Sequence, residues 1–414
     1  MPFALIRHAF KRRPLPRFLP APPAAKRDTY DVIIIGGGGH GLACAYYLIK
    51  QHGIRNIAVL EKGWLGGGNT ARNTAIIRSN YLTEAAIRFY GESARMFAAL
   101  SGELDYNMMH SPRGHLTLAH TDAACRAAKW RANMNRHWGE DSSFVSPREI
   151  AEICPPLNLS TAVRYPIMGA LYHPPGAIAR HDAVAWGYAA RAGEGGAEIF
   201  PQTEVVEILQ QNGTATGVRL ANGDTINAGA IVQATAGASG QTAAMAGFSL
   251  PITAVPLQAM VSQQLAPFLD AIVVSGSLHV YVSQTARGEL VMGGSVDPRS
   301  LNTARSTLRF KESLAGDMLQ LLPSVGEVKI VRQWAGVADM TPDFSPIMGL
   351  SPLKNYYLDA GWGTWGFKAT PACGMTMAAT VASGEPHELI EPYALSRFDS
   401  LNLIGEKAAA SVGH

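Results

Sequence analysis

The feature that most constrains this chain is a glycine-rich turn between two regular elements near its start. A β-branched run at 30–35 predicts a strand, and residues 42–50 predict a helix. Between them lie glycines with the spacing G-x-G-x-x-G, at Gly36, Gly38 and Gly41. The first permits a tight turn, the second lets the backbone approach a pyrophosphate, and the third lets the helix pack closely on the strand. The free N–H groups at the start of the helix would then face the phosphates.

The residues that follow support the same interpretation. A second predicted strand at 57–61 ends in Glu61, twenty residues after Gly41, where a carboxylate can accept hydrogen bonds from ribose hydroxyls. The glycine spacing alone would be a weak signal, but its position between a strand and a helix predicts a dinucleotide site. Residues 32–49 carry no formal charge, yet four consecutive glycines at their centre argue against a membrane helix. We therefore expect no membrane partner.

Three further segments indicate which dinucleotide is bound. A long glycine-rich loop at 63–81 replaces the next helix, and residues 204–240 predict an antiparallel meander with turns at Asn212-Gly213 and 222–224. Residues 355–374 repeat the order of strand and glycine turn, and a helix-prone run follows at 376–384. Together these segments resemble the FAD-binding scaffold of the D-amino-acid oxidase type. A plain nicotinamide-binding Rossmann domain is the alternative.

That resemblance implies an α/β fold with a discontinuous, Rossmann-like FAD-binding domain. A second, mainly antiparallel sheet domain would cover the flavin ring and hold the substrate. The implied limits are an arm at 1–28, an FAD-binding domain at 29–90, 172–248 and 335–400, a substrate domain at 91–171 and 249–334, and a tail at 401–414.

Charge and cysteine usage exclude several classes. The net charge is +3, but residues 1–27 carry seven basic side chains and no acid, so the rest of the chain is slightly acidic. A body-wide basic surface for nucleic acid is therefore absent. The prolines of the basic arm disfavour a helix, so we expect it to lie extended on a partner or to be disordered. The four cysteines show no paired spacing, which predicts neither a metal site nor disulfides and suits the cytoplasm.

Two basic residues in glycine-rich or apolar surroundings are candidates for substrate binding. Arg78 follows an apolar run, and Lys368 follows Gly366-Phe367. Beside a flavin, an arginine and a lysine can hold a substrate carboxylate, although Arg78 could instead pair with a protein carboxylate or the FAD phosphates. The segment 279–294 predicts a hairpin in which Tyr281 either hydrogen-bonds the substrate or packs in the core.

Four long motifs resemble the β-subunit family of heterotetrameric sarcosine oxidases: GGGGHGLACAYYL, VLEKGWLGGGNTARNTAIIRSNY, AIARHDAVAW and GWGTWGFKATPACG. The resemblance spans about residues 29–400. It implies oxidation of the N-methyl group of sarcosine or a close N-methyl amino acid, with hydride passing to noncovalent FAD. Electrons then pass to a covalent FMN and on to O2, which gives H2O2. The implied partners are α, γ and δ subunits, with NAD possibly held by one of them.

The resemblance also assigns the covalent FMN to one of two neighbouring histidines. The family's attachment histidine lies in a basic-His-Asp triplet, which here is Arg180-His181-Asp182, so His181 is the implied attachment site and His173 a bystander. A neutral imidazole nitrogen can attack an electrophilic methyl carbon of the flavin, and Asp182 could orient the ring.

Position by position, the resemblance implies the following contacts with FAD. The dinucleotide motif comprises Gly36, Gly38, Gly39, His40, Gly41, Glu61 and Lys62. The ring-wrapping loop and the adenine-side strand contribute Asn69, Thr74, Ile76 and Val205. The late flavin loop contributes Gly361, Gly363, Gly366 and Lys368. One position departs from the family, because Trp365 stands where the family loop has glycine, and this puts the identity of the amine in doubt.

Two other functions fit part of this pattern. A dye-linked dehydrogenase subunit of the proline or hydroxyproline type would pass electrons to a partner without using O2, and the triplet around His181 argues against it. A noncatalytic FAD-holding subunit would need no carboxylate-binding pair, so Arg78 and Lys368 argue against that function.

Overall fold

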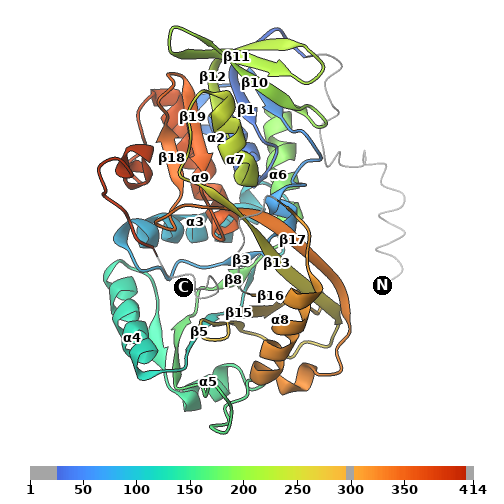
Figure 1. Cartoon of the computed structure of the whole chain (residues 1–414), viewed down its shortest axis with the longest axis vertical. Helices are drawn as coiled ribbons and strands as arrows, with labels where there is room; N and C mark the ends of the chain where they lie inside the picture. The colour runs from blue at the N-terminus through green and yellow to red at the C-terminus, as the bar shows by residue number, and fades with distance from the viewer. Residues whose placement is uncertain (1–25, 295–302, 407–414) are drawn as a thin grey trace, which may run out of the picture.

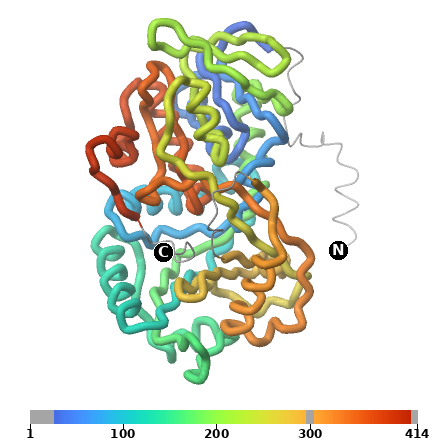
Figure 2. Tube along the Cα trace, viewed as in Figure 1, coloured from blue at the N-terminus to red at the C-terminus, as the bar shows by residue number. Residues whose placement is uncertain are grey.

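The computed structural model describes residues 26–294 and 303–406, which form two halves stacked along the long axis (Figure 1). Most of the basic arm and the end of the tail lie outside the described residues. The upper half in Figure 1 holds one large sheet with its helices, and the lower half holds a second large sheet. The long strands β13 and β17 run from one half into the other (Figure 2). The α/β fold of the D-amino-acid oxidase type expected from the sequence is confirmed; the domain limits remain a prediction.

The first sheet follows the order β10-β11-β12-β1-β2-β9, with β19 joined to β12 and β18 to β19. Its central strands run parallel, and β10, β11 and β12 form the predicted antiparallel meander. The bounds are β1 Thr29–Ile35, β2 Ile57–Leu60, β9 Glu198–Phe200, β10 Val205–Gln211, β11 Thr214–Leu220, β12 Thr225–Gln233, β18 Ile347–Leu350 and β19 Tyr356–Ala360.

Both faces of this sheet are buried. Successive side chains of β1 point to opposite faces and pack in two different hydrophobic cores. Val32 and Ile34 pack against α2 (Gly39–His52), α3 (Glu84–Glu103), α6 (His181–Glu194) and α9 (Gly366–Ser383). Ile33 and Ile35 face the core beneath the meander and α7 (Ser239–Met245). A strand buried on both faces reads as a continuous apolar run, which is the pattern at 32–35.

The second sheet has the order β17-β13-β16-β15-β14-β5-β7-β6. The bounds are β5 His115–Ala119, β6 Ser143–Val145, β7 Gly169–His173, β13 Thr253–Gln264, β14 Ile272–Ser275, β15 Val280–Gln284, β16 Glu289–Gly294 and β17 Ile330–Met340. Its helices are α4 Asp122–His137, α5 Pro147–Ile153 and α8 Leu308–Leu321. The hairpin expected within 279–294 is the antiparallel pair β15–β16.

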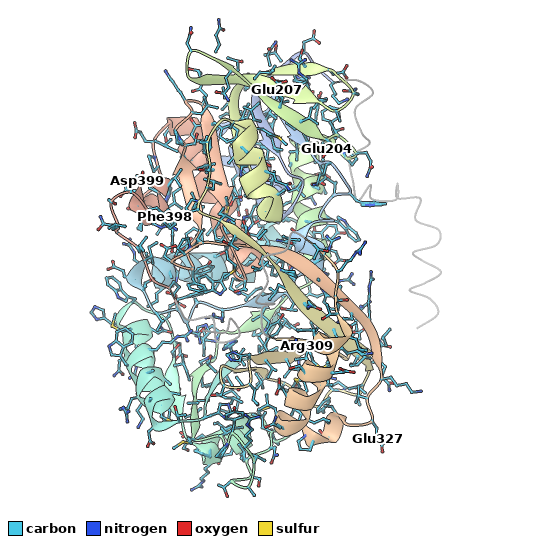
Figure 3. All side chains as sticks on the ribbon, in the orientation of Figure 1. Glu204, Glu207, Arg309, Glu327, Phe398 and Asp399 are labelled. Atoms are coloured by element: carbon cyan, nitrogen blue, oxygen red, sulfur yellow. The ribbon has the colours of Figure 1, made fainter. Side chains whose placement is uncertain are left out.

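Short elements connect the two halves and the C-terminal segment. A small sheet joins β3 (Ile76–Ile77), β8 (Ala177–Ile178) and β4 (Ser111–Pro112). The 3-10 helices are η1 Asn69–Arg72, η2 Ala236–Ala238, η3 Pro323–Val325, η4 Glu391–Tyr393 and η5 Leu395–Arg397. The charged side chains of Glu204, Glu207, Arg309 and Glu327 lie at the outer surface (Figure 3).

The last helix begins earlier than the sequence pattern suggested. Residues expected in a glycine loop form the first turn of α9, which starts at Gly366 and includes Lys368. Pro371 cannot donate a backbone hydrogen bond to the carbonyl four residues earlier. The hydroxyl of Thr370 donates to that carbonyl, of Phe367, at 2.8 Å, so the helix continues through the proline.

In the part of the chain that the structure describes, no helix is both long and apolar enough to span a bilayer.

The start of α5 offers a test of local stability. The Ser146 hydroxyl accepts a hydrogen bond from the Glu149 N–H at 3.4 Å, and the Glu149 carboxylate accepts one from the Ser146 N–H at 2.7 Å. We expect Ser146→Ala to lower the free energy of unfolding by about 1 kcal/mol, because one free N–H at the helix start loses its partner. Urea unfolding measures this, and Ser146→Asp, which keeps an acceptor, should stay close to wild type.

Candidate active site

A cavity of about 270 Å³ lies where β1 and β2 end. Gly36 follows β1 and Glu61 follows β2, so the cavity sits outside the carboxyl ends of parallel strands, where α/β sheets bind ligands. Predicted cofactor residues on its wall are Gly36, Gly38, Gly39, His40, Glu61, Lys62, Asn69, Val205, Gly363 and Gly366. The remaining part of the wall comes largely from β12, β17, β19 and the segments that follow them.

Close backbone contacts require glycine at the first and third positions of the motif. Gly36 has φ +114°, and a Cβ there would lie 2.2 Å from the Ala234 carbonyl oxygen. A Cβ on Gly41 would lie 2.1 Å from the Gly36 carbonyl oxygen, so the third glycine lets α2 pack on the turn. No larger residue fits at either position without moving the backbone. The space that remains beside the N-terminus of α2 suits a pyrophosphate.

The carboxylate of Glu61 is held in place by the backbone. Its Oε2 accepts from the Gly37 N–H at 2.9 Å, and its Oε1 accepts from the Gly63 N–H at 2.7 Å. Each carboxylate oxygen has a further lone pair for a ribose hydroxyl. The residues around this cavity therefore fit the adenosine and pyrophosphate parts of FAD.

His40 belongs to a polar cluster on the wall of this cavity. Its Nδ1 lies 3.1 Å from the Asp359 carboxylate, and its Nε2 lies 2.7 Å from the Gly366 carbonyl oxygen. Burial lowers the pKa of His40, but Asp359 and the Gly366 carbonyl outweigh it, so the pKa is raised. The Cys373 Sγ also lies near, 3.3 Å from Nδ1. These three side chains could in principle ligate a metal, but hydrogen bonds within the cluster account for their arrangement.

A second, smaller cavity of about 100 Å³ adjoins the first. The walls of both include Arg72, Asn73, Leu257, Thr364 and Phe367. Predicted site residues on the smaller cavity are Thr74, Ile76, Arg78, Tyr281 and Lys368. It is therefore a small chamber of mixed polarity beside the dinucleotide cavity.

The two predicted carboxylate-binding residues meet in this chamber. Arg78 is buried, its Nη1 donates to the Asn80 Oδ1 at 2.9 Å, and its guanidinium lies 4.4 Å from the centre of the Tyr81 ring. Lys368 is also buried, and its ammonium has no hydrogen-bond partner among the described residues. Burial first, and Arg78 second, lower the pKa of Lys368 well below its usual value. A bound anion would relieve both effects.

Two aromatic residues complete the wall. Burial raises the pKa of Tyr281 to about 12, so its hydroxyl is neutral, and it pairs with the side chain of Thr74. Trp365 is buried on the chamber wall and meets the Tyr81 ring edge-on, with ring centres 5.6 Å apart. The indole therefore both faces the chamber and packs against a core aromatic ring.

The two neighbouring histidines lie in different surroundings. His181 is the first residue of α6 and its side chain is 31% exposed; its Nε2 lies 3.1 Å from the Ala71 carbonyl oxygen. The His181 ring and the Arg180 guanidinium lower the pKa of Asp182 well below its usual range. His173 is fully buried, with Nδ1 2.6 Å from the Asp141 carbonyl oxygen and Nε2 3.2 Å from the Ser79 hydroxyl.

The structure brings together most of the predicted site residues, but not all of them. Gly41, Gly361 and His181 lie outside both cavity walls, although His181 contacts Ala71, which stands between the wall residues Thr70 and Arg72. Sequence reasoning missed several wall residues: His115, Thr117, Thr203, Thr235, Asp339, Asp359 and Thr370. Only Asp359 carried a local signal, since it is an acid at the end of a strand just before a glycine turn.

Comparisons with known proteins agree with this geometry. The profile of the family described as FAD dependent oxidoreductase matches residues 31–380. The β subunit of sarcosine oxidase from Arthrobacter sp is 45% identical over 96% of this chain and 98% of that protein. The same subunit from Rhodobacter capsulatus is 42% identical over 95% of this chain and 94% of that protein. Among solved structures, L-proline dehydrogenase from P. horikoshii superposes with a TM-score of 0.85 and 28% identity, covering 91% of this chain and 100% of the other. The chain belongs to the FAD-dependent oxidoreductase family of the D-amino-acid oxidase type, among the relatives of the sarcosine oxidase β subunits.

Proposed function

We propose that this flavoenzyme oxidises the N-methyl group of sarcosine or a close N-methyl amino acid. The observation that carries the proposal is the chamber that holds Arg78 and Lys368 directly beside the dinucleotide cavity. Two buried basic side chains on a wall whose described residues include no aspartate or glutamate favour a small anionic substrate, such as an amino acid. The similarity to β subunits of sarcosine oxidase supports an N-methyl amine as that substrate.

The protein supplies position, and the cofactor supplies the redox chemistry. FAD, when bound, accepts a hydride from the carbon next to the substrate nitrogen. Arg78 and Lys368 would hold the carboxylate, while Ile76, Leu257 and Phe367 would keep water from the reacting carbon.

The proposal extends to a second flavin and to partner subunits. His181 would carry FMN, because its ring is reachable from solvent whereas His173 is enclosed. Electrons would pass from FAD to this FMN and reduce O2 to H2O2. The names of the relatives as β subunits support assembly with further subunits, which we propose are of the α, γ and δ types, with NAD on one of them.

A direct experiment is anaerobic mixing of the FAD-loaded protein with sarcosine, followed by flavin absorbance. We expect sarcosine to bleach the flavin, and aerobic turnover of the assembled complex to produce H2O2. A chain whose flavin stays oxidised with sarcosine and with related N-methyl amino acids would contradict the proposal.

The likeness to L-proline dehydrogenase favours a second candidate, a dye-linked proline-type dehydrogenase subunit. It predicts flavin bleaching by L-proline and electron transfer to an artificial dye without H2O2. Comparing L-proline with sarcosine in the same anaerobic assay separates the two functions.

Trp365 offers a test of the chamber size. We expect Trp365→Phe to raise kcat/KM for N-ethylglycine relative to sarcosine by up to about tenfold, because the smaller ring leaves space for one methylene group. Phenylalanine keeps an aromatic contact with Tyr81, so the fold should persist. Unchanged ratios across sarcosine, N-ethylglycine and proline would mean that the indole serves packing alone.

A further inference from the structure

The chamber wall contains one buried histidine that the carboxylate-binding pair leaves unexplained. His115 is the first residue of β5 and is 1% exposed. Its Nδ1 lies 3.5 Å from the Thr117 hydroxyl, whereas its Nε2 has no hydrogen-bond partner among the described residues. A buried polar atom without a partner is costly, and in native proteins it calls for a specific explanation.

The surroundings of His115 keep the ring neutral. Burial first, and then the positive charge of Arg78, lower the pKa of His115 well below its usual value. His173 on β7, Arg131 on α4 and Lys368 on α9 act in the same direction. A neutral imidazole has one N–H and one bare nitrogen. If the N–H is on Nδ1, facing the Thr117 hydroxyl, then Nε2 is the bare nitrogen and can only accept.

The composition of the chamber wall shows why the substrate needs a hydrogen-bond acceptor there. Arg78 and Lys368 offer many donors, and among the described wall residues none is an aspartate or glutamate. A cationic ammonium would therefore meet positive charge and no acidic side chain of the described wall, so the amine binds best in its neutral form. The N–H of a neutral secondary amine then needs an acceptor. The Tyr281 hydroxyl is paired with Thr74, and the Asn73 Oδ1 accepts from the Ala75 N–H.

We propose that His115 Nε2 accepts a hydrogen bond from the N–H of the bound substrate amine and selects secondary over tertiary amines. This role rests on the proposed amine oxidation and adds to it a contact for the nitrogen. A secondary amine such as sarcosine has one N–H to give in its neutral form, and N,N-dimethylglycine has none. His115 then fixes the direction of the nitrogen while the carboxylate is held by Arg78 and Lys368.

The test uses two isosteric ligands that differ in one group. Pyrrole-2-carboxylate has a ring N–H where furan-2-carboxylate has a ring oxygen, and neither is an N-methyl amine. Binding to the FAD-loaded protein is read from the change in flavin absorbance. We expect wild type to bind the pyrrole about tenfold more tightly than the furan, since a buried acceptor is satisfied by only one of them.

The variants separate this contact from the rest of the site. His115→Leu should reduce the preference to near unity while leaving the furan affinity almost unchanged, and His115→Gln, which keeps an acceptor, should restore part of it. A matched control is His120→Asn, a buried histidine just after β5 that hydrogen-bonds the Tyr165 carbonyl and Ser275 and lies outside both cavity walls.

Each outcome has a distinct meaning. Equal loss of both ligands in His115→Leu would assign His115 to the carboxylate and overturn the inference, as would a preference that survives the substitution. If wild type binds neither ligand, the proposed amino-acid substrate is contradicted, because Arg78 and Lys368 then do not bind a carboxylate in the chamber.

Discussion

His181→Ala is expected to yield a chain that carries no covalently attached flavin while it still binds FAD. His181 lies at the start of α6 on the surface, and the FAD cavity does not include it on its wall. Removing the imidazole would therefore remove the proposed bonding atom and its contact with the Ala71 carbonyl, but no residue of the cavity wall. Acid precipitation of the protein, followed by absorbance of the pellet, measures the bound fraction, which should fall from near complete to none.

The structure also determines which control is informative. His173→Ala would leave a hole in the buried network with Ser79 and Asp141, so any loss of flavin there could reflect damaged folding. His137, an exposed residue in the last turn of α4, is a better control, and His137→Ala should retain the covalent flavin. Mass spectrometry of tryptic peptides locates the adduct. A flavin found on a peptide that lacks His181 would contradict the assignment.

The local part of this site could be predicted from sequence because its causes are local. A turn that places Gly36 at φ +114° against Ala234 requires glycine, and Glu61 ends the next strand in the chain. The hairpin at Asn212-Gly213 has positive φ at both residues, 51° and 72°, which the Asn-Gly pair favours. Such preferences are visible in any short window of sequence.

The chamber wall could be predicted only in part because distant strands build it. His115 opposes His173 across β5 and β7 and lies beside Ile272 of β14, a contact between residues far apart in the chain. A histidine at the start of a short strand looks the same whether it faces a substrate or solvent. Lys368 was recognisable from its motif, but its place in the first turn of α9 depends on Thr370 replacing the hydrogen bond that Pro371 cannot make.

Lys368→Met is expected to weaken binding of carboxylate ligands about ten- to hundredfold while FAD stays bound. The substitution keeps an unbranched side chain one atom shorter and removes a charged donor to a desolvated carboxylate, which contributes about 1.5–3 kcal/mol. Titration with methylthioacetate, followed by flavin absorbance, measures the dissociation constant. Lys354→Met is the matched control, because Lys354 is exposed and lies outside both cavity walls.

The pH dependence of the same titration separates charge from shape. Without ligand, burial and Arg78 hold the pKa of Lys368 well below its usual value, while the neighbouring His115 stays neutral. A bound carboxylate favours the ammonium and raises that pKa, so binding takes up a proton at any pH between the two values. Affinity should thus be highest below the unliganded pKa and fall by up to about tenfold per pH unit until the liganded pKa is passed. Lys368→Met should lose this slope along with the affinity. If the variant keeps the wild-type slope, the proton is taken up by another group, and Lys368 does not bind the carboxylate as an ammonium.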